Sequence, residues 1–220
     1  MGWALLVAAV ALLGCSTPDD PVTEDAVTDA VTDDAVAGGD VADDDALADL
    51  LAEGGLVIYL RHTATTTTGV DDLDTLGDCD AQRELSAQGR DDARAIGTAF
   101  DRLDVPVQRV VASPFCRTVD SAELAFGDTD VDEALLALAT ADQGGPELVD
   151  RITEAGRSLI GTVPEDGTNL VLVGQLTNVE PITGTSLAWG EAALFRPDGD
   201  GEVALLATVE LDRWRRLAAG

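Results

Sequence analysis

Three short polar segments carry the side chains of this chain that could do chemistry. The first contains Arg61 and His62, the only histidine in the sequence. The second contains Arg117, and the third begins with Gln175. The planar guanidinium of arginine binds phosphate through parallel charge-assisted hydrogen bonds, each worth about 1.5–3 kcal/mol. Together these donors predict a pocket for an oxyanion such as a phosphoryl group.

Each polar segment follows an apolar run that is typical of a buried strand, at residues 56–60, 109–112 and 169–174. Between the first two runs, Ser86 is suited to cap a helix. Strands that alternate with helices predict an α/β protein, a three-layer sandwich with a mostly parallel central sheet flanked by helices. Ligands of such sheets bind beyond the carboxyl ends of the strands, so we expect the polar segments to meet there. The remaining elements are predicted as helices at 45–53, 117–126 and 146–159 and strands at 193–196 and 203–209.

The charge balance excludes several classes of function. The 220 residues include 42 acidic and 13 basic ones, for a formal net charge of −29. All 13 basic residues are arginines. Such a chain is repelled by nucleic acid, and it lacks the polybasic patch of a membrane-surface protein. One histidine and three cysteines exclude the zinc frameworks that need several of these ligands.

The N-terminus resembles that of an exported lipoprotein. Residues 3–13 are continuously apolar, about half the roughly 20 residues of a membrane-spanning helix and typical of a signal-peptide core. They lead into Cys15 through Leu-Leu-Gly, which resembles a bacterial lipobox. We therefore expect residues 1–15 to be a signal peptide that ends at a lipidated Cys15. No Lys or Arg precedes the apolar run, so an ordinary secretory signal or a buried apolar segment is the alternative.

Residues 16–50 are expected to form an acidic, disordered tether. Residues 16–48 contain eleven Asp or Glu, with no cation and no aromatic residue. Such a segment cannot bury enough apolar surface to offset the entropy lost on ordering. A lipid on Cys15 would then hold a folded domain, residues 51–220, at the extracytoplasmic face of a membrane. A segment with no role beyond solubility would have the same composition.

The folded part resembles the histidine phosphatase, or phosphoglycerate mutase-like, superfamily in four segments that occur in the family's order. Residues 61–65 (Arg-His-Thr-Ala-Thr) resemble its Arg-His-Gly/Ala-x-Thr signature. Residues 85–89 (Leu-Ser-Ala-Gln-Gly) resemble the segment that opens its first long helix. Residues 113–122 resemble its Ser-Pro-Leu-x-Arg-Thr-x-x-Thr-Ala segment, and residues 170–184 the segment that usually carries a second histidine.

This resemblance implies phosphomonoester hydrolysis through a phosphohistidine intermediate on a phosphoglycerate mutase-like fold. His62 would be the nucleophile, Arg61 and Arg117 would hold the phosphoryl oxygens, and Thr65 would add a hydroxyl donor. The implied partner is a small phosphorylated substrate. Neither a metal nor any other cofactor is implied.

The chain departs from the family at two catalytic positions. Gln175 stands where the second histidine is expected; its amide can donate a hydrogen bond to phosphate but carries neither a positive charge nor a transferable proton. Leu176 replaces the acid of one family branch, and neither Asp132 nor Glu133 aligns with the acid of the other. Since general acid catalysis contributes about 10²–10⁴-fold, we expect a weak phosphatase. The alternatives are a catalytically impaired module that binds a phosphorylated or sulfated group, and a lipoprotein whose tether is the active part.

The cysteine count leaves a pair if Cys15 is lipidated. Cys79 and Cys116 would then be exposed to an oxidising compartment, where a disulfide is favoured. Such a bond would connect the segment before the first long helix to the Arg117 segment. Two separate buried thiols are the alternative.

Overall fold

A computed structural model describes residue 41 and residues 43–220. The expected signal peptide, the lipidated Cys15 and the tether up to residue 40 lie outside the described residues. Within the described part of the chain, no helix has the length and apolar character that crossing a membrane requires.

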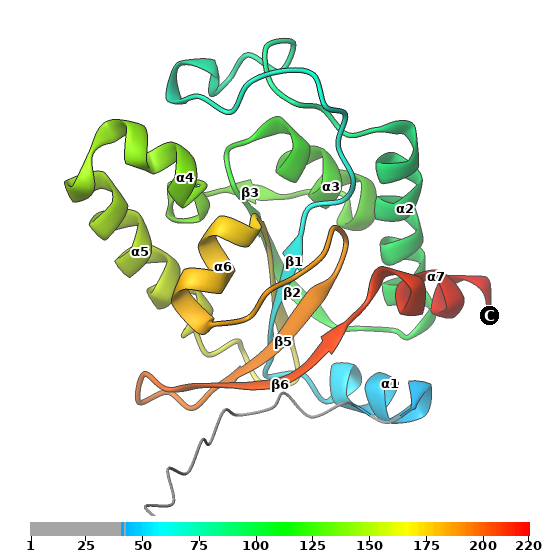
Figure 1. Ribbon diagram of the computed structural model, residues 1–220. Helices are drawn as coiled ribbons and strands as arrows, with labels where there is room; N and C mark the ends of the chain where they lie inside the picture. The colour runs from blue at the N-terminus through cyan, green and yellow to red at the C-terminus, as the bar shows by residue number, and fades with distance from the viewer. Residues whose placement is uncertain (1–40, 42) are drawn as a thin grey trace, which may run out of the picture. The chain divides into compact units, whose positions relative to one another are not determined.

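A six-stranded sheet forms the centre of the described part (Figure 1). Its spatial order is β3-β2-β4-β1-β5-β6. Strands β1 to β4 are parallel, and β5 and β6 extend the sheet beyond β1 as an antiparallel pair. The predicted α/β fold with a mostly parallel sheet is therefore confirmed. The strands are β1 (Val57–Arg61), β2 (Val107–Ala112), β3 (Asp130–Val131), β4 (Asn169–Gly174), β5 (Ala192–Pro197) and β6 (Val203–Val209).

Helices cover both faces of this sheet (Figure 1). One face packs against α1, α2, α3 and α7, and the other packs against α5 and α6, with α4 lying beside α5. The α-helices are α1 (Asp44–Glu53), α2 (Ala87–Arg102), α3 (Cys116–Phe126), α4 (Leu138–Ala141), α5 (Pro146–Ile160), α6 (Leu176–Thr183) and α7 (Leu211–Ala219). Short 3-10 helices are Leu73–Thr75, Glu133–Leu135 and Asp142–Gly144.

The central strands are apolar on both faces because both faces are covered. In β1, Ile58 and Leu60 pack into the core on the α2 side, whereas Val57 and Tyr59 pack into the core on the α5 side. This two-sided burial explains the continuous apolar runs of the sequence, which alternating polar residues would interrupt in a half-exposed sheet.

The start of α2 is set by its cap and by a close backbone contact. The side chain of Ser86 accepts a hydrogen bond from the Gly89 N–H at 3.0 Å. A Cβ atom on Gly89 would lie 2.0 Å from the carbonyl oxygen of Ala64, so only glycine fits there. The Leu-Ser-x-x-Gly segment thus brings α2 directly against the loop that follows His62.

Helix α1 is part of the packed unit. Leu47 and Leu51 are fully buried in the core cluster shared with α2 and α7. The side-chain amide of Asn169, the first residue of β4, donates to the Leu51 carbonyl at 2.8 Å. Residues 44–50 therefore belong to the packed unit, although the domain was expected to begin at position 51.

Candidate active site

The carboxyl ends of β1, β4 and β2 bring the predicted polar segments to one edge of the sheet. The backbone N–H of His62 donates to the Gly174 carbonyl at 3.0 Å, which joins the end of β1 to the end of β4. The backbone N–H of Ser113 donates to the Val173 carbonyl at 3.0 Å, which joins β2 to the same strand. His62, Ser113 and Gln175 therefore follow three neighbouring strands at the same edge, as expected for a ligand site of an α/β sheet.

The hydrogen bonds of His62 fix its tautomer. Its Nδ1 lies 2.8 Å from the Thr63 carbonyl oxygen, which can only accept, so Nδ1 carries the proton. Its Nε2 then has a free electron pair and lies 3.3 Å from the donating Nε of Arg117. Burial, and next the charge of Arg117, lower the pKa of His62 to about 3, although the Thr63 carbonyl opposes this shift. The ring is therefore a neutral imidazole with its nucleophilic nitrogen facing a guanidinium.

Arg117 is a buried cation at the start of α3. Only 1% of the residue is exposed, and its guanidinium carbon lies 4.3 Å from the ring centroid of Phe115. Burial lowers the pKa of Arg117 to about 10, while the carboxylate of Asp71 partly opposes this shift. The group remains charged at neutral pH and can balance an anion beside His62.

A hydroxyl connects the end of β1 to α3. The Ser121 Oγ donates to the Arg117 carbonyl at 2.7 Å and accepts from the backbone N–H of Thr63 at 3.2 Å. Both Thr63 and Ser121 are fully buried. This contact holds the residue after His62 against the helix that carries Arg117.

The guanidinium of Arg61 is anchored on the loop before β5. Its NH1 donates to the Leu187 carbonyl at 2.6 Å, and its guanidinium carbon lies 5.7 Å from the ring of Trp189. Its buried Nε has no hydrogen-bond partner. Burial, followed by the nearby charge of Arg83, lowers the pKa of Arg61. Arg61 thus retains a donor for an oxyanion.

Thr65 and Gln175 each contain a buried polar atom without a partner. The Thr65 Oγ1 is one of these atoms, in a residue bridged to Leu85 through the backbone. In Gln175, Nε2 donates to Ser113 Oγ at 3.1 Å, and Oε1 has no partner. A half-turn of this amide would let the Ser113 hydroxyl donate to Oε1 and would direct Nε2 to the unpartnered side. Both side chains could then donate to a bound oxyanion.

Two site residues, Asp71 and Arg83, escaped the sequence analysis. The Asp71 carboxylate accepts from Arg117 NH1 at 2.8 Å and from Arg83 NH2, so it joins two guanidiniums. Arg83 is the only cation between His62 and Arg90, and this isolated positive charge in an acidic stretch is the signal that could have identified it. Nothing in the sequence distinguishes Asp71 from the other acids nearby.

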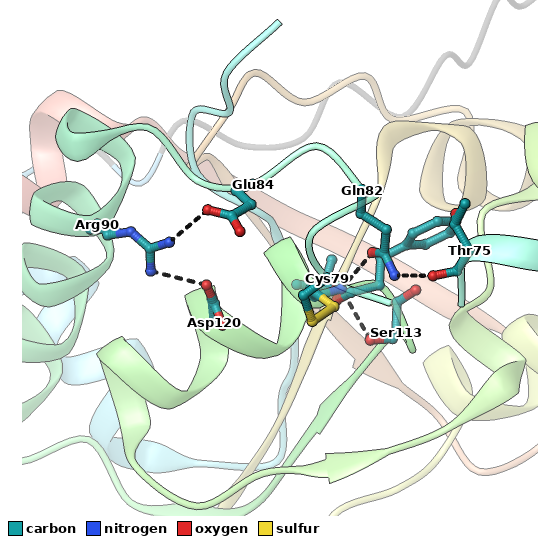
Figure 2. The surroundings of a disulfide bond; sticks show 10 residues. Thr75, Cys79, Gln82, Glu84, Arg90, Ser113 and Asp120 are labelled. Atoms are coloured by element: carbon teal, nitrogen blue, oxygen red, sulfur yellow. Dashed lines mark hydrogen bonds and ion pairs between the residues drawn. A yellow bond between two sulfur atoms is a disulfide. The ribbon is translucent and has the colours of Figure 1, made fainter. Parts of the chain in front are cut away.

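Cys79 and Cys116 form a disulfide, so the pairing that the sequence left open is present in the structure (Figure 2). Its Cα–Cα distance is 5.6 Å, and Cys116 is adjacent to Arg117. The Gln82 side chain reinforces the connection, since its Oε1 accepts from the Cys116 N–H at 2.9 Å and its Nε2 donates to the Thr75 carbonyl at 2.7 Å. The segment that carries Asp71 is thereby fastened to the start of α3.

The described residues contain no group of three or more His, Cys, Asp or Glu side chains arranged to hold a metal ion. The polar groups around His62 are instead mostly donors, with one carboxylate among them. This donor set suits an anionic ligand.

No model of a protein family matches the sequence, and no curated protein matches it. Among solved structures, the protein histidine phosphatase SixA in complex with tungstate is 16% identical, with a TM-score of 0.49 over 71% of this chain and 97% of that one. A mycobacterial glucosyl-3-phosphoglycerate phosphatase with inorganic phosphate is also 16% identical, with a TM-score of 0.49 over 72% and 99%. The phosphoserine phosphatase of Entamoeba histolytica, as an H9A mutant with phosphoserine, is 12% identical, with a TM-score of 0.45 over 72% and 98%.

These solved proteins are phosphatases, and the first is by name a histidine phosphatase. Likeness at this level says nothing about which substrate the present chain takes. The side chains at the edge of the sheet bear on function instead: the neutral His62 contacts Arg117, and Arg117 and Arg83 both pair with the Asp71 carboxylate.

Proposed function

We propose that this chain is a phosphomonoesterase of the histidine phosphatase type, with His62 as its nucleophile. The observation that carries the proposal is the state of the His62 ring. Nδ1 donates to the Thr63 carbonyl, burial keeps the imidazole neutral, and Nε2 lies 3.3 Å from Arg117. A neutral imidazole with an unprotonated Nε2 is what attack on phosphorus requires.

The reaction has two displacements. Nε2 of His62 bonds to phosphorus while the bond from phosphorus to the ester oxygen breaks, and the leaving alkoxide takes a proton from water. Water then attacks phosphorus while the bond to Nε2 breaks, its proton neutralises the hydroxide left by the first displacement, and inorganic phosphate leaves as His62 regains its electron pair. Arg61 and Arg117 would stabilise the charge on the phosphoryl oxygens, with Thr65 and Gln175 as further donors.

The presence of glutamine at position 175 indicates slow turnover rather than efficient catalysis. Its amide can donate to a phosphoryl oxygen but cannot protonate a leaving group. The loss of general acid catalysis costs about 10²–10⁴-fold with poor leaving groups and much less with a phenolate, which leaves without a proton. Aryl phosphates are therefore the substrates on which activity should be sought.

A phosphate-binding module without turnover is the second candidate. The observation that favours it is the ion pair between Arg117 and Asp71, in which a carboxylate of the chain itself takes one of the groups that would bind phosphate. In this case the same arginines would recognise a phosphorylated group, and His62 would act only as part of the pocket.

An aryl phosphate assay on the purified protein separates the two candidates. We expect slow hydrolysis that is lost in His62→Ala and His62→Asn, with a phosphoryl group on His62 detectable by mass spectrometry after quenching. Arg94→Gln, an exposed substitution on α2, is the control for general effects. Phosphate protection against heat would confirm that each variant retains its fold. Absence of hydrolysis in the parent, together with activity in Gln175→His, would instead favour the binding module.

We also propose that the protein is exported and held by a lipid on Cys15 at the extracytoplasmic face of a membrane. The lipobox-like sequence before Cys15 supports this location. The Cys79–Cys116 disulfide supports it independently, because such bonds persist mainly in oxidising compartments. The residues between Cys15 and helix α1 would then be the spacer between the lipid and the packed unit.

A further inference from the structure

One carboxylate lies at the centre of the positive charge in the site. The Asp71 Oδ1 accepts from Arg117 NH1 at 2.8 Å, and its Oδ2 accepts from Arg83 NH2. Arg117 also donates through Nε to His62 Nε2 at 3.3 Å. A single guanidinium therefore connects the carboxylate to the nucleophile, and Asp71 occupies the space in which an anion would contact both arginines.

Asp71 is held there as an anion. Burial alone would raise the pKa of Asp71, but the hydrogen bonds and charges of Arg83 and Arg117 outweigh it and lower the pKa. A carboxyl group in this state is a poor proton donor. Its role at neutral pH is to balance positive charge, so it does not replace the general acid that the sequence lacks.

The two arginines need an anion between them. Arg117 has a side chain only 2% exposed, and Arg83 lies close enough to lower its pKa. Two cations that converge without a counter-ion repel each other, and burial strengthens this repulsion. Two oxygens of a phosphoryl group could accept from the same two guanidiniums as the two oxygens of the carboxylate do.

We propose that Arg83 and Arg117 form the anion site for the phosphoryl group of the substrate, and that Asp71 is an internal competitor which this group displaces. The inference rests on the proposed function, and it adds Arg83 as a binding residue and Asp71 as the group that pairs with both arginines in its place. The Asp71 side chain is 26% exposed, so its carboxylate reaches water by a rotation of the side chain.

Displacement leaves the rest of the segment in place. Around Asp71, the Gln143 side chain donates to the Asp71 carbonyl at 3.1 Å and accepts from the Leu73 N–H at 3.2 Å. The disulfide at Cys79 fastens the same segment further along. The exchange of anions is therefore confined to side chains, and the cost of binding is mainly the loss of the two Asp71 ion pairs.

Calorimetric titration of the full chain with inorganic phosphate at pH 7 tests this proposal. We expect Asp71→Asn to lower the phosphate Kd about tenfold or more, because the competitor loses its charge. Asp80→Asn is the matched control, since it removes the same charge from an exposed position of the same segment. Asp71→Ser is a second variant in case the asparagine variant is poorly folded, and a thermal melt of each variant reports its folding.

Arg83 is tested in the background that lacks the competitor. Relative to Asp71→Asn, the double variant Asp71→Asn/Arg83→Gln should bind phosphate about tenfold more weakly. The matched control is Asp71→Asn/Arg94→Gln, which removes an exposed arginine from α2 and should leave the Kd unchanged.

The binding result and the turnover result are separable. If folded Asp71→Asn and Asp71→Ser bind phosphate no better than Asp80→Asn, the competitor is ruled out, even if aryl phosphate hydrolysis still depends on His62. If the double variant binds as well as Asp71→Asn, Arg83 is not part of the site. If hydrolysis is absent but both expected changes in Kd occur, the anion site stands and the phosphatase proposal fails. Absence of phosphate binding in every folded variant would overturn both.

Discussion

The imidazole of His62 is neutral because of what surrounds it. Burial and the charge of Arg117 lower its pKa to about 3, whereas in an unfolded chain a histidine titrates near 6.5. Two consequences follow at this one residue. The His62 imidazole stays unprotonated across the pH range in which most phosphatases are assayed. Between pH 7 and pH 5, His62 binds a proton in the unfolded chain but not in the folded protein.

This difference in proton uptake should appear as acid sensitivity. As the pH falls from 7 to 5, the unfolded chain binds a proton at His62 and the native state does not, so stability falls as pH falls. The expected loss from this one group is about 2 kcal/mol over that interval. The measurement is the free energy of urea unfolding at pH 7 and pH 5 for the parent and for His62→Asn.

The comparison with His62→Asn isolates the histidine because both proteins contain the same carboxylates. We expect the decrease in stability between pH 7 and pH 5 to be about 2 kcal/mol smaller in the variant than in the parent. Equal decreases in the two proteins would show that His62 takes up its proton normally in the folded state. The neutral nucleophile of the proposed mechanism would then lose its physical basis.

A site residue was predictable where regular strand pairing positions it, and not where an irregular segment does. His62 and Arg117 follow buried strands, and parallel pairing alone brings such residues together, so their approach to 3.3 Å could be anticipated. Asp71 and Arg83 lie in a segment that is mostly irregular. Their contact with Arg117 depends on how that segment folds over the edge of the sheet, which no local pattern specifies.

The helices and strands likewise differ in how far the local sequence predicts them. The strands at 57–61, 107–112 and 169–174 agree with the predicted apolar runs, and α2 begins after its predicted cap at Ser86. Helices α6 and α7 were not predicted. Helix α6 contains Pro181, which argues against a helix locally, and α7 is stabilised by burial of Trp214 in the main core. Tertiary packing overrides the weak local signal of α6, whereas Leu211, Trp214 and Leu217 recur in α7 at helical spacing, a local pattern that could have predicted it.

The disulfide is the element-scale feature with the largest expected effect on stability. It closes a loop between residues separated by 37 positions, and this loop contains Arg83 and the whole of α2. In the chain-entropy account, the bond limits the unfolded chain far more than the folded one. We expect Cys79→Ala/Cys116→Ala to lose about 2–4 kcal/mol of unfolding free energy, measured by urea titration without reductant.

Reductant provides the internal control for this prediction. Added to the parent protein, it should lower the unfolding free energy toward that of the double variant, and it should leave the double variant unchanged. A parent and a double variant that unfold at the same urea concentration without reductant would argue that the bond is absent from the purified protein. The argument for an oxidising compartment would then fail with it.

At the scale of the whole molecule, charge decides how the protein can be held at a membrane. The formal net charge is −29, and residues 16–48 contain no cation. Anionic lipid surfaces repel such a chain, so electrostatic attachment is excluded. None of the described helices could span a bilayer. In the proposed attachment the lipid at Cys15 holds the chain, and since one acyl chain gives only marginal binding, we expect more than one chain there.

This dependence gives a simple test in a bacterial host that processes lipoproteins. The parent should sediment with membranes and stay there after a wash in concentrated salt, because screening weakens ionic contacts and leaves buried acyl chains in place. Cys15→Ser should move to the soluble fraction, whereas Ser16→Ala, a substitution at the neighbouring position, should sediment like the parent. If Cys15→Ser stays with the membranes, the apolar segment at residues 3–13 or a partner protein holds the chain, and the tether does not begin at a lipid. If the parent is soluble and exported, residues 1–15 act as an ordinary secretory signal, and the phosphate site works free of any membrane.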